Sequence, residues 1–297
     1  MMPLEVRALQ ATSVAALIGL ALPGGAAVNV GSMWDYNKPA LSEERFRAAL
    51  ATAQGDDALI LKTQIARTWG LRRDFAKARQ ILAELEPQLG QASPEARTRY
   101  WLELGRTWAS ATHKPAELTA EAKAKARDAY DRALAVAKAA RLDGLAIDTV
   151  HMYAFIDTAP EDGIRWADEG LKLANASTQP AARHWRAVLH NNKGVALNQL
   201  KRHDEALAEF KTALPLYEAG GNSTYIRIAH WMVAHTLRLL GHLDEAREIQ
   251  LRLEREWDVA NDPDPYVFEE LEAIYKAQGN AERAAHYAAR LKASSKP

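Results

Sequence analysis

Cysteine is absent from the 297-residue chain, which excludes disulfides, thiolate metal sites and cysteine nucleophiles. A net charge of either sign is absent as well, because 38 Lys and Arg residues balance 38 Asp and Glu residues. The overall charge therefore does not indicate nucleic acid or an anionic membrane as a partner. Hydrophobic residues make up 48% of the chain, which is enough for a sizeable core and is not typical of a disordered protein.

Motifs for catalysis and for metal or phosphate binding are missing too. There is no HExxH motif, no glycine-rich phosphate loop and no GxSxG elbow. His230 and His235 are five residues apart, which places them about 140° apart around a helix and makes a shared metal ion improbable. Asp148 and His151 lie three residues apart on one helical face and could form an acid–base pair, but no nucleophile accompanies them. We predict a non-enzymatic protein with no cofactor and no metal site, in which Asp148 and His151 have a structural or binding role.

The first part of the chain differs in character from the rest. Its run "ATSVAALIGLAL" is apolar, too short to span a bilayer, and is followed by "PGGAA". This arrangement suits the apolar region and cleavage zone of a secretory signal. Arg7 would supply the positive charge that precedes the apolar region of such a signal, and Glu5 offsets it. We favour the alternative, in which the native protein begins at Met33 and the preceding segment is an unstructured extension.

These observations predict two parts of the chain. Residues 1–32 form an extension or signal-like segment, disordered or absent from the mature protein, and residues 33–297 form a single domain. The predicted location is the cytoplasm. The alternative is the periplasm or the exterior, if residues 1–27 act as a signal peptide.

From Ser42 onward the sequence reads as helix almost without interruption. Long segments rich in Ala, Leu, Glu, Arg and Lys alternate with short breaks that carry Gly, Pro, Asp or Asn. Ser93 before Pro94, and Asp264 before Pro265, are typical helix starts. The breaks "LGHLDEA" and "QGNAERA" each place a glycine between two helices. The pattern predicts a chain of helical hairpins without strands.

These hairpins repeat. The small residue of each second helix recurs at intervals of 48, 37, 43, 40 and 38 residues, at Ala78, Ala126, Gly163, Ala206, Ala246 and Ala284. Four residues later stand Leu82, Tyr130, Ala167, Phe210, Gln250 and Ala288. In the first helices, one equivalent slot holds Ile65, Leu104, Val150, Lys193, Val233 and Leu271. These slots mark the faces where the two helices of a pair meet, so that small residues allow close approach and large ones fill the space beside them.

Lys193 is the polar exception in its slot. In the interpretation we favour, its methylene stem packs between the helices while the ammonium reaches the edge of the repeat. In the alternative, the ammonium contacts a ligand or a buried acid.

The segments "WLELGRTW", from Trp101 to Trp108, and "ALAEF", from Ala206 to Phe210, match the first- and second-helix patterns of the tetratricopeptide repeat family. With six registers between Asp57 and Lys292, the chain resembles this family, and its long repeats and "HNN" are similar to the kinesin light chain type. The resemblance implies an all-α, right-handed α-α superhelix of about six helical pairs. A capping helix is expected over Ser42–Gln54, and a longer connection in the second hairpin.

The resemblance also implies a concave groove lined by the first helix of each pair. The groove-facing slots of the family fall here on Gln64, Arg67, Arg99, Glu103, Arg106, Asp148, Met152, Asn191, Asn192, Val195, Trp231 and His235. We select Arg67, Arg99, Glu103, Arg106, Asn191, Asn192, Trp231 and His235 as candidate peptide-binding residues. Asparagine side-chain amides can hydrogen-bond to a peptide backbone, and arginines can form bidentate ion pairs with carboxylates.

Two observations bear on this groove prediction. The lysine and asparagine set with which some family members clamp a terminal carboxylate is not reproduced in this sequence. Trp231 suits a binding anchor, and the alternative for it is packing against the next helical pair.

The predicted function is that of a scaffold or adaptor for a protein or peptide partner. No nucleic acid partner and no membrane insertion of the mature domain are expected, and the oligomeric state stays open. One alternative is a small-ligand-binding regulator or enzyme that uses Asp148, His151 and Trp231. The other is an exported cell-envelope assembly factor, which depends on the signal-like segment.

Overall fold

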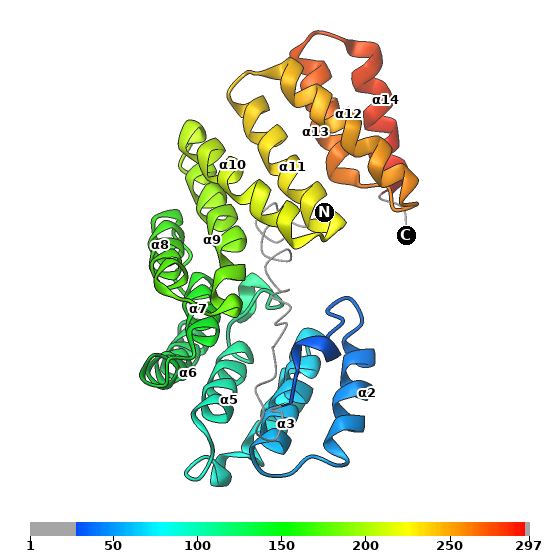
Figure 1. Cartoon of the computed structure of the whole chain (residues 1–297). Helices are drawn as coiled ribbons and strands as arrows, with labels where there is room; N and C mark the ends of the chain where they lie inside the picture. The colour runs from blue at the N-terminus through cyan, green and yellow to red at the C-terminus, as the bar shows by residue number, and fades with distance from the viewer. Residues whose placement is uncertain (1–27, 295–297) are drawn as a thin grey trace. The chain divides into compact units, whose positions relative to one another are not determined.

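A computed structural model describes residues 28–294 of the chain, and these residues form 13 α-helices with short 3-10 turns and no strand (Figure 1). The helices are α2 (Pro39–Leu50), α3 (Gly55–Leu71), α4 (Phe75–Ala83), α5 (Pro94–Arg106), α6 (Ala120–Ala139), α7 (Asp143–Met152), α8 (Pro160–Ala176), α9 (Pro180–Gln199), α10 (His203–Gly220), α11 (Ser223–Leu239), α12 (Leu243–Val259), α13 (Pro265–Ala277) and α14 (Ala281–Ser294). The predicted all-α class is confirmed.

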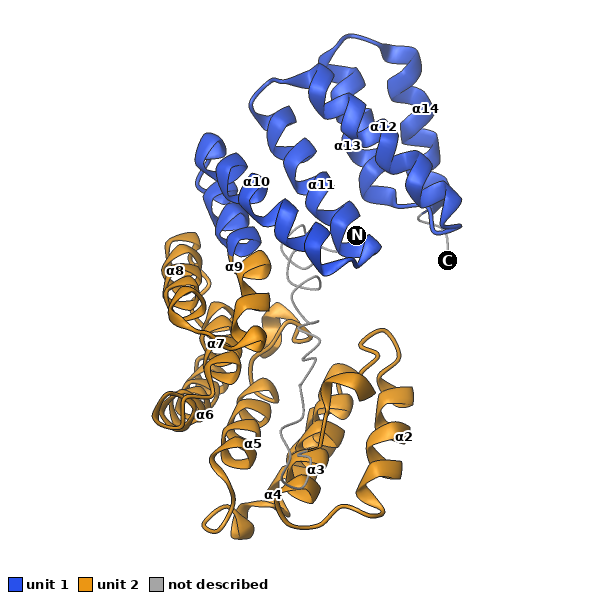
Figure 2. Cartoon of the chain, viewed as in Figure 1, with its two compact units in different colours: residues 1–11, 190–297 blue, residues 12–189 orange. Residues whose placement is uncertain are grey.

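Contacts divide the described chain into two compact units. The amino-terminal unit spans residues 28–189, and the carboxy-terminal unit spans residues 190–294 (Figure 2). The boundary falls inside α9, whereas the sequence predicted a single domain over residues 33–297.

The helices follow one another as the six predicted pairs, from α3–α4 to α13–α14. α2 packs on α3 in the place of the predicted capping helix, and α3 also packs along α5, the first helix of the next pair. The second pair has the longer connection that the sequence predicted, since Thr107–Thr119 separates α5 from α6 and includes the 3-10 turn Pro115–Glu117. Repetition of similar pairs thus accounts for most of the described chain.

The predicted helix starts are confirmed. The Ser93 hydroxyl accepts a hydrogen bond from the Ala96 amide at 3.3 Å, and the Asp264 carboxylate accepts one from the Tyr266 amide at 3.0 Å. Each side chain thereby satisfies an amide that the first turn of its helix leaves without a partner.

The turns within four of the pairs share a left-handed residue five positions before the small residue of the second helix. Gly241 and Gly279 adopt this conformation with φ of 85° and 74°. At the equivalent positions, Arg73 and Lys201 adopt it with φ of 66° and 59°, without the freedom of glycine. The sequence signal was therefore visible in two of these turns and hidden in the other two.

Five of the six predicted small residues are buried: Ala78, Ala126, Ala206 and Ala246 fully, and Ala284 at 4% exposure, whereas Gly163 in α8 is only partly buried. A Cβ added to Gly194 would lie 2.7 Å from the ring of Phe210 in the partner helix. A glycine at this position is required because the ring lies directly against the α9 backbone.

Residues 28–38, here called the strap, pack on the amino-terminal unit before α2 begins. Val30 is only 4% exposed and joins the core that contains Phe46, while the Val28 amide donates to the Asp57 carboxylate at 3.2 Å. The helical unit therefore includes residues before the predicted boundary at Met33. The signal-like run falls in residues 1–27, which lie outside the described residues.

Candidate functional site

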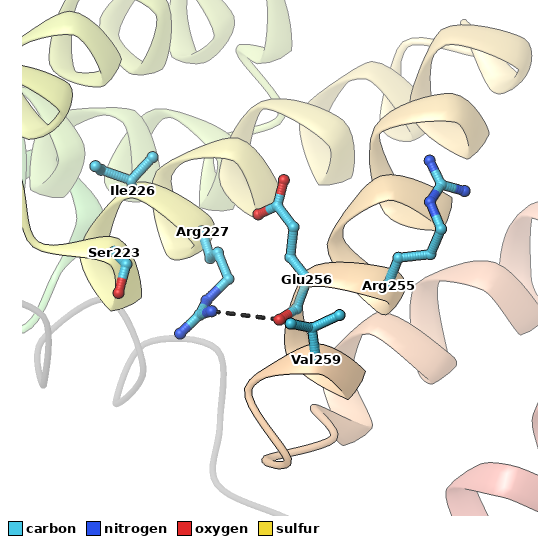
Figure 3. Close-up of a pocket in the computed structure, with 6 residues that line it drawn as sticks. All are labelled: Ser223, Ile226, Arg227, Arg255, Glu256 and Val259. Carbon is cyan, nitrogen blue, oxygen red and sulfur yellow. Dashed lines mark hydrogen bonds between the residues drawn. The ribbon is translucent and has the colours of Figure 1, made fainter.

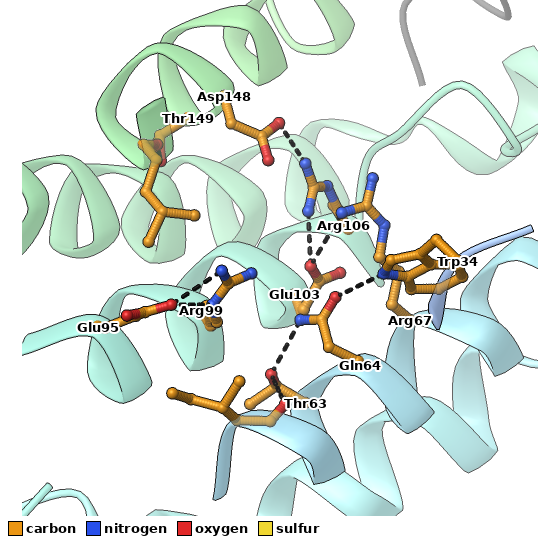
Figure 4. Close-up of polar contacts among 12 residues, drawn as sticks. Trp34, Thr63, Gln64, Arg67, Glu95, Arg99, Glu103, Arg106, Asp148 and Thr149 are labelled. Carbon is orange, nitrogen blue, oxygen red and sulfur yellow. Dashed lines mark hydrogen bonds and ion pairs between the residues drawn. The ribbon is translucent and has the colours of Figure 1, made fainter. Parts of the chain in front are cut away.

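Three consecutive first helices of the amino-terminal unit bring their polar side chains into one connected row (Figure 4). Arg106 on α5 donates to Glu103 at 2.6 Å and to the carboxylate of Asp148 on α7. Arg67 on α3 lies 3.6 Å from the same Glu103 carboxylate. Together with Gln64, these residues are called the polar strip. They come from positions far apart in sequence, and the sequence predicted all five as lining residues.

The charges of the polar strip balance. Burial alone would raise the pKa of Asp148, but Arg106 and Arg67 outweigh burial and hold this pKa below its ordinary value. Burial lowers the pKa of Arg106, and the neighbouring Asp148 and Glu103 more than reverse this effect, so its pKa is raised. Two cations and two anions therefore coexist in a site where Glu103 is 2% exposed. Such a strip offers donors and acceptors without a net charge.

The strap covers one end of the polar strip. The Trp34 indole donates to the Gln64 amide oxygen at 3.1 Å, and the rings of Trp34 and Tyr36 are stacked with centroids 4.6 Å apart. The Arg67 guanidinium carbon lies 5.4 Å from the Trp34 ring centroid and 5.3 Å from that of Tyr36. Two predicted lining residues thus already contact aromatic rings of the same chain. The sequence reasoning missed this contact, although the pattern "MWDYN" places two aromatic residues two positions apart.

Arg99 is not joined to the polar strip. It pairs with Glu95 at 2.9 Å, one turn earlier in α5 (Figure 4). Met152, another predicted lining residue, is buried.

Asp148 and His151 differ in their nearest contacts. The Asp148 carboxylate is engaged by Arg106, whereas the His151 ring lies 5.6 Å from Phe155 and 5.5 Å from Trp185, centroid to centroid. Burial lowers the pKa of His151 to about 4, so the imidazole is neutral at neutral pH. These surroundings favour a structural role. Between residues 28 and 294, no group of three or more His, Cys, Asp or Glu side chains could hold a metal ion.

The carboxy-terminal unit contains a second buried polar cluster. The Glu270 carboxylate lies 2.9 Å from the His235 ring and accepts from Arg238 at 2.8 and 2.9 Å. Burial would raise the pKa of Glu270, but hydrogen bonds from His235 and Arg238 outweigh burial and lower it. Trp231 stacks on His235 at 4.9 Å, is 2% exposed, and donates its indole N–H to the Tyr266 carbonyl at 3.2 Å. This placement fits the alternative prediction, in which Trp231 packs against the next pair.

The two candidate asparagines of α9 differ in access. Asn191 is 1% exposed, so it is not available to a peptide backbone in this conformation, and its amide nitrogen has no hydrogen-bond partner among the described residues. Asn192 and Val195 are partly exposed. Of the two asparagines, Asn192 is therefore the better placed for a ligand.

Lys193 meets an acid on the partner helix. Its ammonium lies 3.0 Å from the carboxylate of Glu209 on α10, and the His190 ring lies 2.6 Å from the same carboxylate. Burial would raise the pKa of Glu209, but the hydrogen bonds from His190 and Lys193 outweigh burial and lower this pKa. The side chains of Lys193 and Glu209 are 22% and 19% exposed, so the ammonium does not simply reach the solvent.

The repeat position that Glu209 occupies accounts for the lysine at position 193, where the other five repeats carry an apolar residue. Three residues after each small residue, the six second helices carry Ile81, Ala129, Trp166, Glu209, Ile249 and Tyr287. Glu209 is the acidic exception in this slot, as Lys193 is the basic exception in its own. The compensating acid was visible in the sequence and was missed, because only the neighbouring slots were compared.

A surface pocket of ≈ 370 Å³ lies in the carboxy-terminal unit, between the start of α11 and the end of α12 (Figure 3). Its lining consists of Ser223, Ile226, Arg227, Arg255, Glu256 and Val259. None of the predicted site residues lines it. Arg227 lies over the ring of Trp257 at 3.8 Å, and it donates to the Glu256 carbonyl at 3.5 Å.

The model of the tetratricopeptide repeat family matches residues 185–254, which confirms the resemblance predicted from the repeats. The match includes α10 and α11 and parts of α9 and α12. No curated protein matches the sequence. None of the helices between residues 28 and 294 is long and apolar enough to cross a membrane.

Solved structures share the fold at low sequence identity. PilW, a widely conserved type IV pilus biogenesis factor, is 20% identical with a TM-score of 0.56 over 80% of this chain and 93% of its own. A signal transduction ATPase with a tetratricopeptide repeat sensor, from Pyrococcus horikoshii, is 13% identical with a TM-score of 0.62 over 90% of this chain and 42% of its own. A Rap protein complexed with competence and sporulation factor is 14% identical with a TM-score of 0.52 over 96% and 72%. These likenesses confirm the predicted fold class, a tetratricopeptide-repeat-like helical fold.

Proposed function

We propose that this protein is a non-enzymatic interaction scaffold, located in the cytoplasm, that binds an extended segment of a partner protein along the polar strip. The observation that carries the proposal is the connection of Arg67, Glu103, Arg106 and Asp148 across three consecutive first helices. An extended peptide that crosses successive helices would meet this row of donors and acceptors along its length. The Rap protein complexed with competence and sporulation factor gives an example of a similar fold that holds a factor.

The charge balance of the polar strip indicates the kind of segment. Each arginine already faces a carboxylate, so a strongly acidic or phosphate-rich ligand would have to break internal ion pairs in order to bind. Backbone amides and neutral polar side chains can hydrogen-bond to the strip without doing so. This favours a peptide of mixed composition over nucleic acid.

The small-ligand alternative receives less support. Asp148 is engaged by Arg106, His151 is neutral and packed against Trp185, and Trp231 is buried in the other unit. The alternative of an exported envelope factor depends on residues 1–27, and the PilW likeness is a likeness of fold. Mass spectrometry of the amino terminus of the native protein tests export, because cleavage within residues 1–32 at a small residue is its expected signature.

The proposal is tested by inverting the polar strip while keeping its internal pairing. In the quadruple variant Arg67→Glu/Glu103→Arg/Arg106→Glu/Asp148→Arg, every ion pair of the strip still joins opposite charges, but each position presents the opposite charge to a partner. Affinity capture from the native source, quantified by mass spectrometry, should lose the specific partners of the wild type.

A matched control exchanges an exposed ion pair outside the strip. Arg252 and Glu256 lie 3.6 Å apart on α12, and the variant Arg252→Glu/Glu256→Arg should recover the same partners as the wild type. If the inverted strip keeps all partners while its circular dichroism and melting temperature match the wild type, the proposed binding surface is wrong.

A further inference from the structure

We propose that Trp34 and Tyr36 act as an intramolecular ligand of the polar strip, and that the partner segment carries the same pattern of two aromatic residues two positions apart and displaces them. The proposal rests on the proposed function and adds the chemical class of the partner. It also assigns the strap a role in controlling access to the site.

The receiving side is organised for an aromatic donor. The Gln64 amide is buried, and its nitrogen donates to the Thr63 hydroxyl at 3.1 Å. This bond fixes the amide so that its oxygen faces the Trp34 indole N–H at 3.1 Å (Figure 4). A buried acceptor held in this way favours a ligand that brings one N–H or O–H donor attached to a flat apolar ring.

Arg67 completes the receiving side. Its guanidinium lies at nearly equal distances, 5.4 and 5.3 Å, from the centroids of the stacked Trp34 and Tyr36 rings. Both distances are within the range of cation–π attraction. Because Arg67 also faces Glu103 at 3.6 Å, the site attracts aromatic faces without requiring an anionic ligand. Two stacked rings therefore satisfy the arginine better than one.

The strap is anchored before the two rings and at Asp35, between them. Val30 is buried before them, and the Val28 amide is bonded to Asp57. The Asp35 amide donates to the Ser42 hydroxyl at 2.7 Å, and this hydroxyl donates back to the Asp35 carbonyl at 3.0 Å. These contacts do not involve the rings, so the rings can leave the polar strip while the strap stays attached.

The two rings differ in what they cover. The Tyr36 ring contacts Trp34 and Arg67, whereas the Trp34 ring also lies edge-on against the fully buried Phe46 at 5.0 Å. Removal of Trp34 without replacement would expose Phe46 to water. A displacing segment must therefore supply an aromatic ring of its own at this position. A tethered ligand acts at a high effective concentration, which lowers the apparent affinity for any free peptide.

The test uses the full-length chain and a synthetic peptide with the sequence of residues 31–37, GSMWDYN, labelled with fluorescein at its carboxyl end. Fluorescence anisotropy should show the peptide binding to Tyr36→Ala roughly tenfold more tightly than to the wild type, because one internal ring no longer competes. Arg67→Met added to Tyr36→Ala should abolish this gain. Tyr36→Phe keeps the ring and should match the wild type.

Two controls separate competition from unfolding. Phe75 stacks on His113 at 3.9 Å in the same unit, and Phe75→Ala should leave the peptide affinity unchanged. The peptide GSMADAN should not bind any variant. Thermal unfolding is recorded for each variant, so that a gain in affinity can be assigned to a folded protein.

Equal affinity of Tyr36→Ala and the wild type for GSMWDYN, or equal binding of GSMADAN, would overturn the inference. If the peptide experiment fails in either of these ways but inversion of the polar strip abolishes capture of the native partners, this inference is wrong and the proposed function stands. If partners survive the inversion but Tyr36→Ala gains affinity for the peptide, the proposed function in its broader form is wrong, and the aromatic site at Gln64 and Arg67 remains.

Discussion

Arg106 on α5 and Asp148 on α7 form an ion pair between two consecutive helical pairs, and the same guanidinium also holds Glu103 at 2.6 Å. One side chain therefore bonds to two carboxylates of low exposure, and Arg67 beside Glu103 supplies the second positive charge. Removal of only the cation or only an anion from the polar strip should therefore lower the stability of the fold strongly, because a charge of low exposure would lose its partner.

We expect Arg106→Met to lower the free energy of unfolding by about 3–5 kcal/mol at pH 7, because Glu103 and Asp148 lose their shared cation. Denaturant unfolding measures the change. In the wild type the lowered pKa of Asp148 contributes stability above its ordinary value of 3.8, and this contribution is lost as the pH falls through the folded pKa. In the variant Arg106 no longer offsets burial, so the pKa of Asp148 rises. The stability of the variant should therefore increase between pH 7 and pH 5, and a constant deficit would contradict this explanation.

The ion pair of Lys193 with Glu209 should be replaceable by an apolar pair. Lys193→Leu/Glu209→Ile restores the composition of the other repeats, and we expect it to raise the free energy of unfolding by about 1 kcal/mol, since both side chains are only about one-fifth exposed. Glu209→Ile removes the acid beside the Lys193 ammonium, and Lys193→Leu leaves Glu209 with His190 alone, so each single variant should be less stable than the double variant. A double-mutant cycle by denaturant unfolding gives the coupling energy. A double variant less stable than both singles would show that the ion pair contributes more than the apolar contact.

Gly194→Ala should lower the free energy of unfolding by about 1–3 kcal/mol, because the new methyl group would lie 2.7 Å from the Phe210 ring. Gly70 in α3 is the matched control, since nothing lies within 4 Å of a Cβ built there. Gly70→Ala should be neutral or raise stability by up to about 1 kcal/mol. Equal effects at the two glycines would refute close packing at Gly194.

Lys201→Gly should raise the free energy of unfolding by about 0.5–1 kcal/mol, because lysine adopts a left-handed conformation there with φ of 59°. The equivalent residue in the next pair, Gly241, has the same conformation with φ of 85°. The reverse change, Gly241→Lys, should therefore lower stability by a similar amount. Thermal unfolding of both variants checks the pair, and a shift in the same direction for both would contradict the prediction.

Gln250→Leu should raise the free energy of unfolding by about 1–3 kcal/mol. The Gln250 side chain is fully buried, and neither its amide oxygen nor its amide nitrogen has a hydrogen-bond partner among the described residues. Leucine removes the cost of burying an unpaired amide and fills a slot that Leu82, Tyr130 and Phe210 occupy elsewhere. Gln88→Leu on the exposed 3-10 turn Glu86–Gln88 is the control and should have little effect. Lower stability in Gln250→Leu would indicate that the amide is satisfied by a bound water molecule.

Packing within each helical pair could be predicted from the sequence because it is local and repeated. Gly194 and Phe210 lie in adjacent helices, and the same combination of small and large residues recurs along the chain. Ser93 and Asp264 act within one turn of their own helices, so their capping bonds followed from the sequence alone.

The candidate site could be predicted only in part. The slots of Arg67, Glu103, Arg106 and Asp148 followed from the family resemblance, but their ion pairs depend on the distance between helices some 40 residues apart in sequence. The contact of Trp34 with Gln64 was missed because the strap has no repeat that would place it. The repeat pattern continues through α9 and therefore gives no sign of the division of contacts there.

The second helices of the six pairs present similar apolar faces. The first helix of a pair, such as α9, therefore has wrong partners available while the protein folds. The slot opposite Lys193 would then hold Ile81, Ala129, Trp166, Ile249 or Tyr287, and none of these can neutralise its ammonium. Only α10 carries the matching acid. The ion pair therefore favours α10 over the other second helices as the partner of α9, and a charge pair of this kind specifies which helices associate.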